Sequence, residues 1–489
     1  MKNSARSLTL ILLAALTAQT FACGSEPTGG ETTPADTEST APETEKPFAD
    51  DLGEYDFGGA DFTMLVREMR KDLIVPESET GDVVNDAIFA RNSKLAERFN
   101  VKIKYVVLED KSATWNQALE SSVMSGDGDY DLVLPDYWWG CETRGLYLNL
   151  LDYDVLDFSE PYWCAGWNDN AEIYGQLYSA VGSMSLDLIR NLEVIYTNSE
   201  LIGSLKLENP YDLVYDGKWT LDKMLEMSNA ALSDLNGDGE YKITDDRFGY
   251  VSDLQAARAL LYSAGMKVAT RVADDSYELN FMNERFVDRY KKVYDIINNE
   301  TSCYYMPTGQ VDLGTGDDLN GFFKAGNILF LGAGLFDTDN LRDMTTDFGI
   351  IPTPKLDEEQ ENYVCYNFGT YYAAILKTAK NPEMSAVMLE ALNAESYKSV
   401  VGTYFDTALK GKYSRDEETA RMLDLILDST YFDFAFVNQS SLGSVGGFFF
   451  RQIQAGKENI TAAYESERAN FEAKLETLLE TYRNAAKTE

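Results

Sequence analysis

The segment between residues 62 and 134 alternates strand-like and helix-like patterns in the order βαβαβ. Apolar residues recur at helical spacing in two stretches, and the intervening stretches either alternate apolar and polar residues or are short and apolar. The expected elements are strand Phe62–Val66, helix Asp82–Asn100, strand Val101–Val107, helix Ala113–Met124 and strand Leu132–Leu134, which Pro135 ends. Because parallel strands joined by helical crossovers favour this order, the sequence predicts an α/β fold with a parallel sheet.

The loop after the third of these strands reads Asp136, Tyr137, Trp138 and Trp139. Three consecutive large aromatic side chains cannot all face one core from a single strand or helix. In open α/β sheets the carboxyl ends of the strands are where ligands bind. We therefore expect at least one of the three rings to line a cleft. The alternative is an aromatic anchor that pins the loop to its own domain.

The remaining chain continues the pattern, and 489 residues suggest two or three domains. Further strands are expected at Leu192–Asn198, Ile328–Leu331 and Phe348–Ile351. Further helices are expected after a Thr220 cap, at Gln255–Ala264, Asn283–Asn298, Asn381–Ala394 and Asp416–Leu427, and in a long C-terminal segment.

Charge and composition exclude several functions. The chain has 81 acidic and 42 basic residues, a formal net charge of -39, so a nucleic acid is not expected as a partner. The sequence contains no His, which excludes Ser-His-Asp and Cys-His catalysis and His-bearing zinc sites. The enzyme chemistry that remains uses paired carboxylates, Lys or Tyr. Aromatic residues make up 12% of the chain, which suits a protein that stacks on flat ligands.

The N-terminus has the pattern of an export signal. Lys2 and Arg6 precede the apolar run Leu8–Ala18, which is too short to span a bilayer, so residues 1–22 are expected to be a signal peptide. A small residue followed by Cys23 resembles a bacterial lipoprotein cleavage box, with ordinary cleavage near Ala22 as the alternative. Residues 23–54 are expected to be a lipidated Cys23 and a disordered acidic tether.

Four further cysteines are Cys141, Cys164, Cys303 and Cys365. Outside the cell they could form two disulfides in three connectivities, and free buried thiols are the alternative. We assign no bridge.

The segment 234–245 has the spacing of a calcium loop. Oxygen-bearing side chains stand at loop positions one, three and five, a glycine stands at position six where the turn needs a positive φ, and an acid closes position twelve. The expected ligands are Asp234, Asn236, Asp238, the Glu240 carbonyl and Asp245. The loop resembles those of EF-hand and dockerin modules, and we expect it to staple a loop. The alternative is an acidic turn without an ion.

Several segments in order carry a wider resemblance between about Tyr55 and Tyr404: FTMLVRE, GDYDLVLPDYWWG, LEVIYTNSEL, GKWTLDKM, DLNGDGEYKITDDRFGYV, FKAGNILFLGAG and FGTYYAAILKTAKNPEMSAVMLEAL. They resemble extracellular solute-binding proteins of family 1, the lipoproteins of carbohydrate ABC importers in Gram-positive bacteria. The resemblance implies an α/β, two-lobe, periplasmic-binding-protein-like fold with a parallel or mixed sheet in each lobe and an interlobe cleft. Lobe 1 is expected to comprise residues 55–184 and 368–404, and lobe 2 residues 185–367 and 405–489.

The resemblance also implies the partners and the site. It implies a sugar ligand, a partner ABC permease, a lipid anchor in the membrane at the extracellular face, and a monomer without catalytic activity. The implied ligand-binding residues are Arg67, Glu68, Asp136, Tyr137, Trp138, Trp139, Gly334, Phe336, Tyr371 and Tyr372.

Two other functions fit the sequence less well. One is a secreted carbohydrate-active enzyme that uses paired carboxylates, although no acidic pair stands at a recognisable strand-end motif. The other is a surface adhesin-like module, which would show no closure driven by a ligand.

Overall fold

The computed structural model describes residues 49–137, 145–272, 276–306, 319–405 and 417–486. The described residues all belong to one compact unit of the chain, residues 48–489. The expected signal peptide and Cys23 therefore lie outside the described residues. Described contacts begin inside the segment expected to be a tether, because Ala49 N donates to Glu395 Oε1 and Arg98 forms an ion pair with the buried Asp50.

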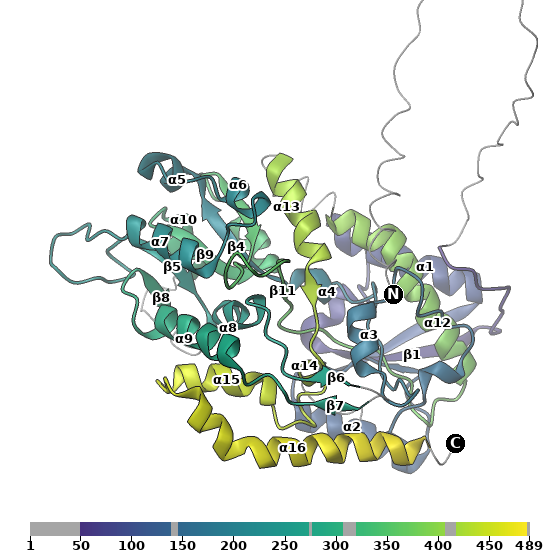
Figure 1. The fold of residues 1–489 in the computed structure, drawn as a ribbon. Coiled ribbons are helices and arrows are strands. Elements are labelled where there is room, and N and C mark those ends of the chain that lie inside the picture. Colours follow the sequence, from purple (N-terminus) through teal and green to yellow (C-terminus); the bar gives the residue numbers. More distant parts are fainter. Residues whose placement is uncertain (1–48, 138–144, 273–275, 307–318, 406–416, 487–489) are drawn as a thin grey trace, which may run out of the picture. The chain divides into compact units, whose positions relative to one another are not determined.

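The first sheet contains three parallel strands in the order β2-β1-β3 (Figure 1). Its elements are β1 (Ala60–Arg67), α1 (Val83–Phe99), β2 (Val101–Leu108), α2 (Ser112–Ser125) and β3 (Leu132–Val133). The βαβαβ prediction is confirmed, apart from boundaries. On the far side of β3 the returning segment 371–376 adds antiparallel bridges, with Val133 opposite Ala374 and Asp136 opposite Tyr371.

Local chemistry explains why α1 begins and ends where it does. The Asp82 carboxylate accepts hydrogen bonds from Val84 N and Asn85 N, which otherwise have no partner in the first turn. Asn100 ends the helix in the left-handed region with φ 50°, a conformation that asparagine tolerates better than most residues. The next strand begins at once at Val101.

The second sheet is mixed, with strand order β10-β4-β9-β5-β8. Its strands are β4 (Glu193–Asn198), β5 (Phe248–Ser252), β8 (Cys303–Tyr305), β9 (Ile328–Gly334) and β10 (Phe348–Pro352). β4 runs antiparallel to both β10 and β9, whereas β9, β5 and β8 run parallel. The expected strands β4, β9 and β10 are confirmed. β5 and β8 were not expected from the sequence.

Helices accompany both sheets (Figure 1). Before residue 270 they include α3 (Ala165–Ala171), α4 (Asp187–Arg190), α5 (Ser199–Leu205), α6 (Pro210–Tyr215), α7 (Leu221–Ala231) and α8 (Leu254–Ser263). In the second half they include α9 (Glu284–Asn298), α10 (Leu319–Lys324), α11 (Thr338–Leu341), α12 (Pro382–Glu395), α13 (Glu417–Asp428), α14 (Phe434–Val437), α15 (Val445–Gln454) and α16 (Ile460–Ala485). The expected helices are confirmed, and Thr220 caps α7 by accepting from Lys223 N.

Three segments lie side by side where the chain passes between the two sheets. Leu192 is bridged to Asn367, and Phe368 N donates to Asn191 O at 3.1 Å. The short strands β11 (Cys365–Tyr366) and β12 (Thr430–Tyr431) then pair in parallel. Main-chain hydrogen bonds and the side chains of Asn191 and Asn367 join these crossing segments.

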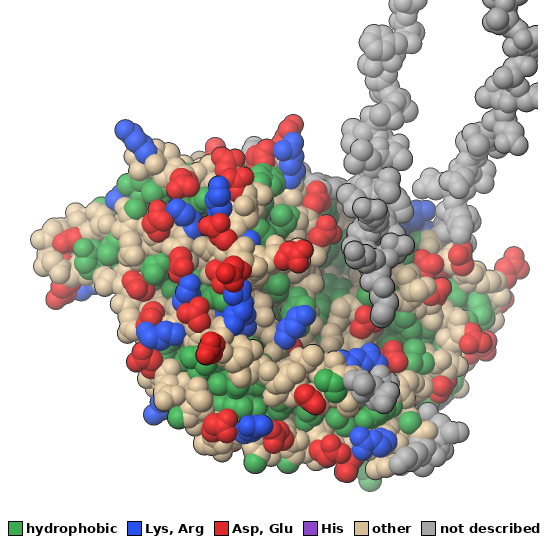
Figure 2. Space-filling model, viewed as in Figure 1, with side chains coloured by type: hydrophobic (Ala, Val, Ile, Leu, Met, Phe, Trp, Pro, Cys, Tyr) green, Lys and Arg blue, Asp and Glu red, His purple; other side chains and the backbone are tan. Residues whose placement is uncertain are grey.

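Cys164, Cys303 and Cys365 are free, and Cys141 lies outside the described residues. Among the described residues no helix is long and apolar enough to cross a membrane. Acidic side chains are scattered over the face seen in Figure 2, with Lys and Arg side chains between them.

One buried acid gives the fold a pH dependence. Glu390 of α12 is 2% exposed and accepts hydrogen bonds from the Tyr162 hydroxyl and from Trp163 Nε1. Burial raises the pKa of its carboxyl group to about 7. The pKa of the Glu390 carboxyl group is higher in the folded state than in the unfolded chain. Its contribution to the free energy of unfolding is therefore fully present below the unfolded pKa, and it is lost as the pH rises through about 7.

We predict that Glu390→Gln removes this part of the pH dependence. At about pH 8 the free energy of unfolding of the variant should exceed that of the parent by on the order of 2 kcal/mol. Near pH 4 the two free energies of unfolding should agree. Urea unfolding across this pH range measures the difference. Glu383→Gln removes an exposed acid from the same helix and should follow the parent at each pH. Parallel curves for parent and Glu390→Gln would contradict the prediction.

Candidate functional site

The ends of β1 and β3 bring Arg67 and Asp136 together. The two strands run parallel and in register, so both leave the sheet at the same edge. Arg67 Nη1 donates to Asp136 Oδ2, and Arg67 Nε donates to Asp110 Oδ1 at 2.7 Å. We call Arg67, Asp110 and Asp136 the first edge.

The Arg67 guanidinium is occupied by contacts within the protein. Its side chain is 9% exposed, and Nη2 lies 3.0 Å from Met69 Sδ. Asp110 Oδ2 also accepts from Met69 N at 3.0 Å, so this ion pair fixes the turn that follows β1. Glu68, the first residue of η1 (Glu68–Leu73), is exposed. At the first edge a ligand would therefore meet carboxylates before it meets the Arg67 guanidinium.

The aromatic loop after β3 is only partly described. Tyr137 is 1% exposed, its hydroxyl donates to Phe368 O at 2.7 Å, and its ring packs edge-on against Trp167. Tyr137 therefore anchors the loop to its own domain, which is the alternative stated for these aromatic residues in the sequence analysis. Trp138 and Trp139 lie outside the described residues.

Tyr371 and Tyr372 are also used by the fold. Each is 1% exposed. The Tyr371 hydroxyl donates to Met184 O at 2.7 Å, and the Tyr372 ring packs edge-on against Tyr147. A ligand could touch these tyrosines only after a change in packing, so their role as ligand contacts stays a prediction that this arrangement does not favour.

The end of β9 presents an aromatic pair. Phe336 lies in η6 (Leu335–Asp337) and is half-buried, and its ring meets the half-buried Phe368 ring edge-on, with 6.1 Å between centroids. Gly334 allows this arrangement, because an added Cβ would lie 2.4 Å from the Phe336 ring. Phe368 belongs to the crossing segments, so the pair joins the end of β9 to the passage between the sheets. Gly334 and Phe336 were expected from the sequence, whereas Phe368 was not.

A charged group that the sequence analysis did not single out lies at the same end of the second sheet. Glu193 begins β4 and is paired with Gly334 at the end of β9, Asp253 directly follows β5, and Asp337 ends η6. Arg258 of α8 interacts electrostatically with the Glu193 carboxylate. We call Glu193, Asp253, Asp337 and Arg258 the second edge.

The second edge is electrostatically crowded. Burial raises the pKa of Glu193 well above its usual value, the charges of Asp253 and Asp337 raise it further, and Arg258 opposes them. Asp253 is solvent-exposed, and yet loss of hydration to the surrounding protein is the largest cause of its raised pKa. An acid directly after a short apolar strand was the sequence signal for Asp253, but β5 had not been recognised.

The predicted calcium loop has part of the geometry that it needs. Gly239 has φ 81°, and Asp234 accepts from Gly237 N at 2.6 Å and from Gly239 N at 2.9 Å, so the loop folds around its first carboxylate. Asn236 and Asp238 likewise accept from main-chain N–H groups two residues ahead.

The remaining predicted ligands are less converged. Lys242 Nζ lies 2.5 Å from Glu240 Oε2 and 3.6 Å from Asp238 Oδ2. Asp245 is exposed, and the buried Asp246 closes the loop by accepting from Leu235 N and Lys242 N. No three His, Cys, Asp or Glu side chains in the described part of the chain are arranged to hold a metal ion. The oxygen atoms of the loop are donors of the kind that calcium binds. The calcium site itself stays a prediction.

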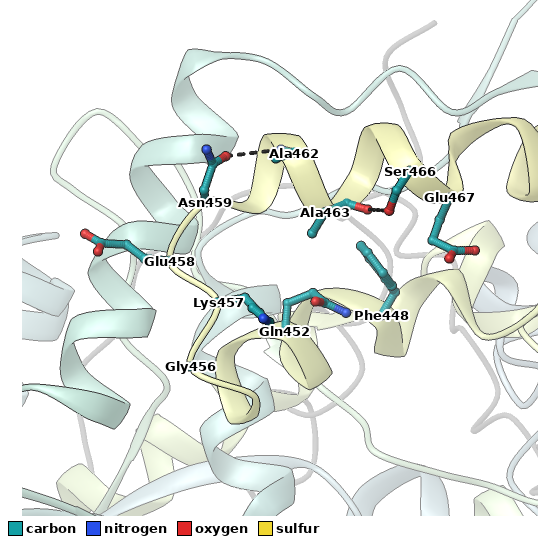
Figure 3. Close-up of a pocket in the computed structure, with 10 residues that line it drawn as sticks. All are labelled: Phe448, Gln452, Gly456, Lys457, Glu458, Asn459, Ala462, Ala463, Ser466 and Glu467. Carbon is teal, nitrogen blue, oxygen red and sulfur yellow. Dashed lines mark hydrogen bonds between the residues drawn. The ribbon is translucent and has the colours of Figure 1, made fainter.

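One cavity lies away from both edges. It has a volume of about 580 Å³ and lies between α15 and α16 (Figure 3). Its lining includes Phe448, Gln452, Asn459 and Ser466, none of which belongs to the sites expected from the sequence. We do not assign the ligand site there.

Comparison with known proteins identifies the fold. No protein-family model and no curated protein matches the sequence. Maltose-bound MalE3 of T. maritima is 13% identical with a TM-score of 0.53, covering 86% of this chain and 100% of that chain. The galacto-N-biose-/lacto-N-biose I-binding protein of the ABC transporter from Bifidobacterium longum, in complex with lacto-N-biose, is 17% identical with a TM-score of 0.54, covering 88% and 98%. An ABC substrate-binding protein from Listeria monocytogenes, in complex with cycloalternan, is 11% identical with a TM-score of 0.51, covering 88% and 99%.

The fold is therefore the expected two-lobe α/β fold of the periplasmic-binding-protein type, with a parallel sheet and a mixed sheet. The two-lobe fold that the resemblance to family 1 solute-binding proteins implies is confirmed. Several of the similar structures are described as solute-binding or substrate-binding proteins of ABC transporters. The expected lobe boundaries and the individual ligand-binding residues stay predictions.

We predict that Arg67→Met destabilises the fold by about 2–4 kcal/mol, because it leaves two half-buried carboxylates without their common cation. Thermal or urea unfolding of the variant measures this loss. Adding Asp136→Asn to Arg67→Met should restore part of it. Lys104→Met breaks a solvent-exposed pair with Asp61 and should leave the unfolding midpoint nearly unchanged. Equal effects of Arg67→Met and Lys104→Met would contradict the assignment.

Proposed function

We propose that this protein is an extracellular substrate-binding lipoprotein that captures a carbohydrate and delivers it to an ABC import permease. The observation that carries the proposal is the shared fold. Proteins solved with maltose, lacto-N-biose, cycloalternan and maltotetraose match this chain over almost their whole length. The ligand would bind between the two lobes, as in hinge-closing binding proteins.

The chemistry of the two edges supports a sugar. Sugars present C–H faces that stack on aromatic rings and hydroxyl groups that donate to carboxylates. The half-buried Phe336 and Phe368 supply rings, and Asp136 and Asp253 supply carboxylates at the strand ends. We propose these residues as ligand contacts, together with Glu68 and the predicted Trp138 and Trp139.

The proposed function is binding without turnover. The similar structures named above are binding proteins, and their likeness supports a non-enzymatic role here. The membrane anchor through Cys23, the extracellular location, the permease partner and the monomeric state belong to the same proposal. The sequence of residues 1–54 supports the anchor.

We predict that a glycan library contains a ligand that raises the melting temperature of the protein. A ligand at about 100 times its Kd stabilises the folded state by about 2.7 kcal/mol, which is a shift of several degrees. Phe336→Ala should remove most of the shift, because a stacking ring is lost. Tyr215→Ala, which changes an exposed ring on α6, should keep it.

The same incubation tests the enzyme alternative. Chromatography of the glycan after incubation should show it unchanged. Hydrolysis would contradict the binding proposal, and a library without any stabilising glycan would contradict the choice of ligand class.

We further propose that the loop 234–245 binds Ca²⁺ as a structural ion. The expected result is a saturable rise in melting temperature on calcium titration, which Asp238→Ala abolishes and Asp222→Asn, an exposed acid on α7, does not. Magnesium should give a smaller shift, because it demands stricter octahedral coordination. An unchanged melting temperature of the parent protein across the titration would remove the assignment.

A further inference from the structure

The cavity between α15 and α16 is formed by one face of each helix. Phe448 and Gln452 lie one turn apart on α15 and line it, and Figure 3 shows them facing the first turns of α16. Ala462 and Ala463 line it from α16. Their small side chains leave open the space that larger residues would fill. The volume of about 580 Å³ is within the range of small-molecule sites.

The closed end of the cavity is held in place by the protein. Gly456 has φ 67°, and Lys457 N donates to Gln452 O at 2.9 Å, which turns the chain directly after α15. From α9, the Tyr294 hydroxyl donates to Gly456 O at 3.2 Å and the Tyr290 hydroxyl donates to Lys457 O. The connection between the helices therefore needs no ordering when a ligand binds.

Several polar groups that line the cavity have hydrogen-bonding capacity that the fold does not use. Within the described part of the chain, the Gln452 carboxamide and the Lys457 ammonium group make no hydrogen bond or ion pair. Ser466 Oγ donates to Ala463 O at 2.7 Å and keeps its lone pairs. Gln452 is half-buried, and Lys457 and Ser466 are exposed, so a ligand reaches all three.

The charges that line the cavity balance. Lys457 contributes one positive charge and Glu467 one negative charge, and Glu458 is paired with Lys291 Nζ at 3.3 Å. Glu467 is half-buried and accepts from Asn470 Nδ2 at 3.3 Å. A charged ligand would be attracted by one of Lys457 and Glu467 and repelled by the other. A neutral ligand with hydroxyl groups donates to Glu467 and accepts from Lys457 without adding charge.

The cavity also has an apolar floor. The Phe448 ring is 6% exposed and packs edge-on against the Phe471 ring, with 5.4 Å between centroids, so its position is fixed. The methyl groups of Ala462 and Ala463 continue the apolar surface. A sugar ring has the matching chemistry, because it carries C–H groups that pack on apolar surface and several hydroxyl groups.

We propose that the cavity between α15 and α16 is a second carbohydrate site, which holds one neutral sugar ring. The inference goes beyond the proposed function, because this site lies away from both edges and uses none of their residues. A surface site of this kind holds one unit of a longer glycan and raises the local concentration of the remaining units.

Limited acetylation of lysines in the full chain, followed by mass spectrometry, tests the site through Lys457. The probes are glucose, galactose, xylose, N-acetylglucosamine, maltose and cellobiose. At about nine times its Kd a sugar fills the site about nine tenths of the time, so acetylation of Lys457 should slow about tenfold with at least one of them. Lys102, exposed on β2, should keep its rate. Glucuronate and glucosamine should protect Lys457 less, because Glu467 repels the first and Lys457 the second.

Matched variants assign the protection to the cavity. Ala462→Trp fills the cavity with an indole ring and should abolish the effect of the sugar on Lys457. Thr461→Trp adds the same side chain at the neighbouring exposed position, which does not line the cavity, and should keep it. Gln452→Met removes the carboxamide and should raise the sugar concentration required at least about threefold. If Ala462→Trp does not fold, Gln452→Met still decides.

The outcomes separate this inference from the proposed function. If no neutral sugar slows acetylation of Lys457, or if a charged analogue protects it better, the inference is wrong. It is also wrong if Ala462→Trp and Thr461→Trp respond alike, or if Phe336→Ala removes the protection. In each case the proposed function stands as long as a glycan raises the melting temperature. If the only stabilising sugars are those that protect Lys457, and Phe336→Ala leaves their effect unchanged, the second site stands and the proposed interlobe site fails.

Discussion

Main-chain hydrogen bonds among the crossing segments connect the two sheets of the protein. Phe368 N donates to Asn191 O, and Cys365 N donates to Ser429 O at 2.8 Å. The Asn191 side chain adds a bond to Gly369 O at 2.6 Å. The Asn367 side chain adds bonds to Asp187 O and Leu188 O, so main-chain and side-chain contacts together fix these segments. Both edges are placed by this constraint, because β4 begins and the segment beside β3 returns within these few residues.

The protein uses its aromatic residues mainly for structure. Tyr137, Tyr371 and Tyr372 contact main-chain acceptors or other rings, whereas Phe336 and Phe368 near the crossing segments are half-exposed. The carboxylates show the opposite pattern. Arg67 is shared by two acids at the first edge, and the second edge carries three acids. In the described part of the chain, acids gather at both strand ends beside a basic group, Arg67 at the first edge and Arg258 at the second.

Local patterns were sufficient to predict much of the fold. The order βαβαβ, the Asp82 and Thr220 caps and the long C-terminal helix depend on residues that are neighbours in sequence, and the structure contains them. The strands β5 and β8 were missed because they are short and flanked by polar loops. The two-residue strands β11 and β12 exist only through their partner in a distant part of the chain.

The candidate site was less predictable for a physical reason. Arg67 and Asp136 were foreseen at one edge, because parallel register follows from the crossover pattern. The burial of Tyr137 depends on Phe436 and Trp167, which come from elements that no local pattern connects to β3. Glu193 belongs to a strand whose sequence is otherwise mostly apolar. A single acid in such a strand is expected at a solvent-facing position of the sheet. The position of Trp138 and Trp139, on which the sequence analysis placed most weight, stays a prediction.

The returning segment 371–376 has a consequence for biosynthesis. Val133 N donates to Ala374 O at 2.9 Å, and Ala374 N donates to Val133 O at 3.0 Å, so the outer side of β3 is covered by residues made long after it. During synthesis from the N-terminus, every strand of the second sheet emerges before this partner does. The part of the chain that is translated first is thus the last to complete its sheet. An incomplete chain would present an open strand edge until residue 376 is available, which favours delaying folding until the polypeptide is whole.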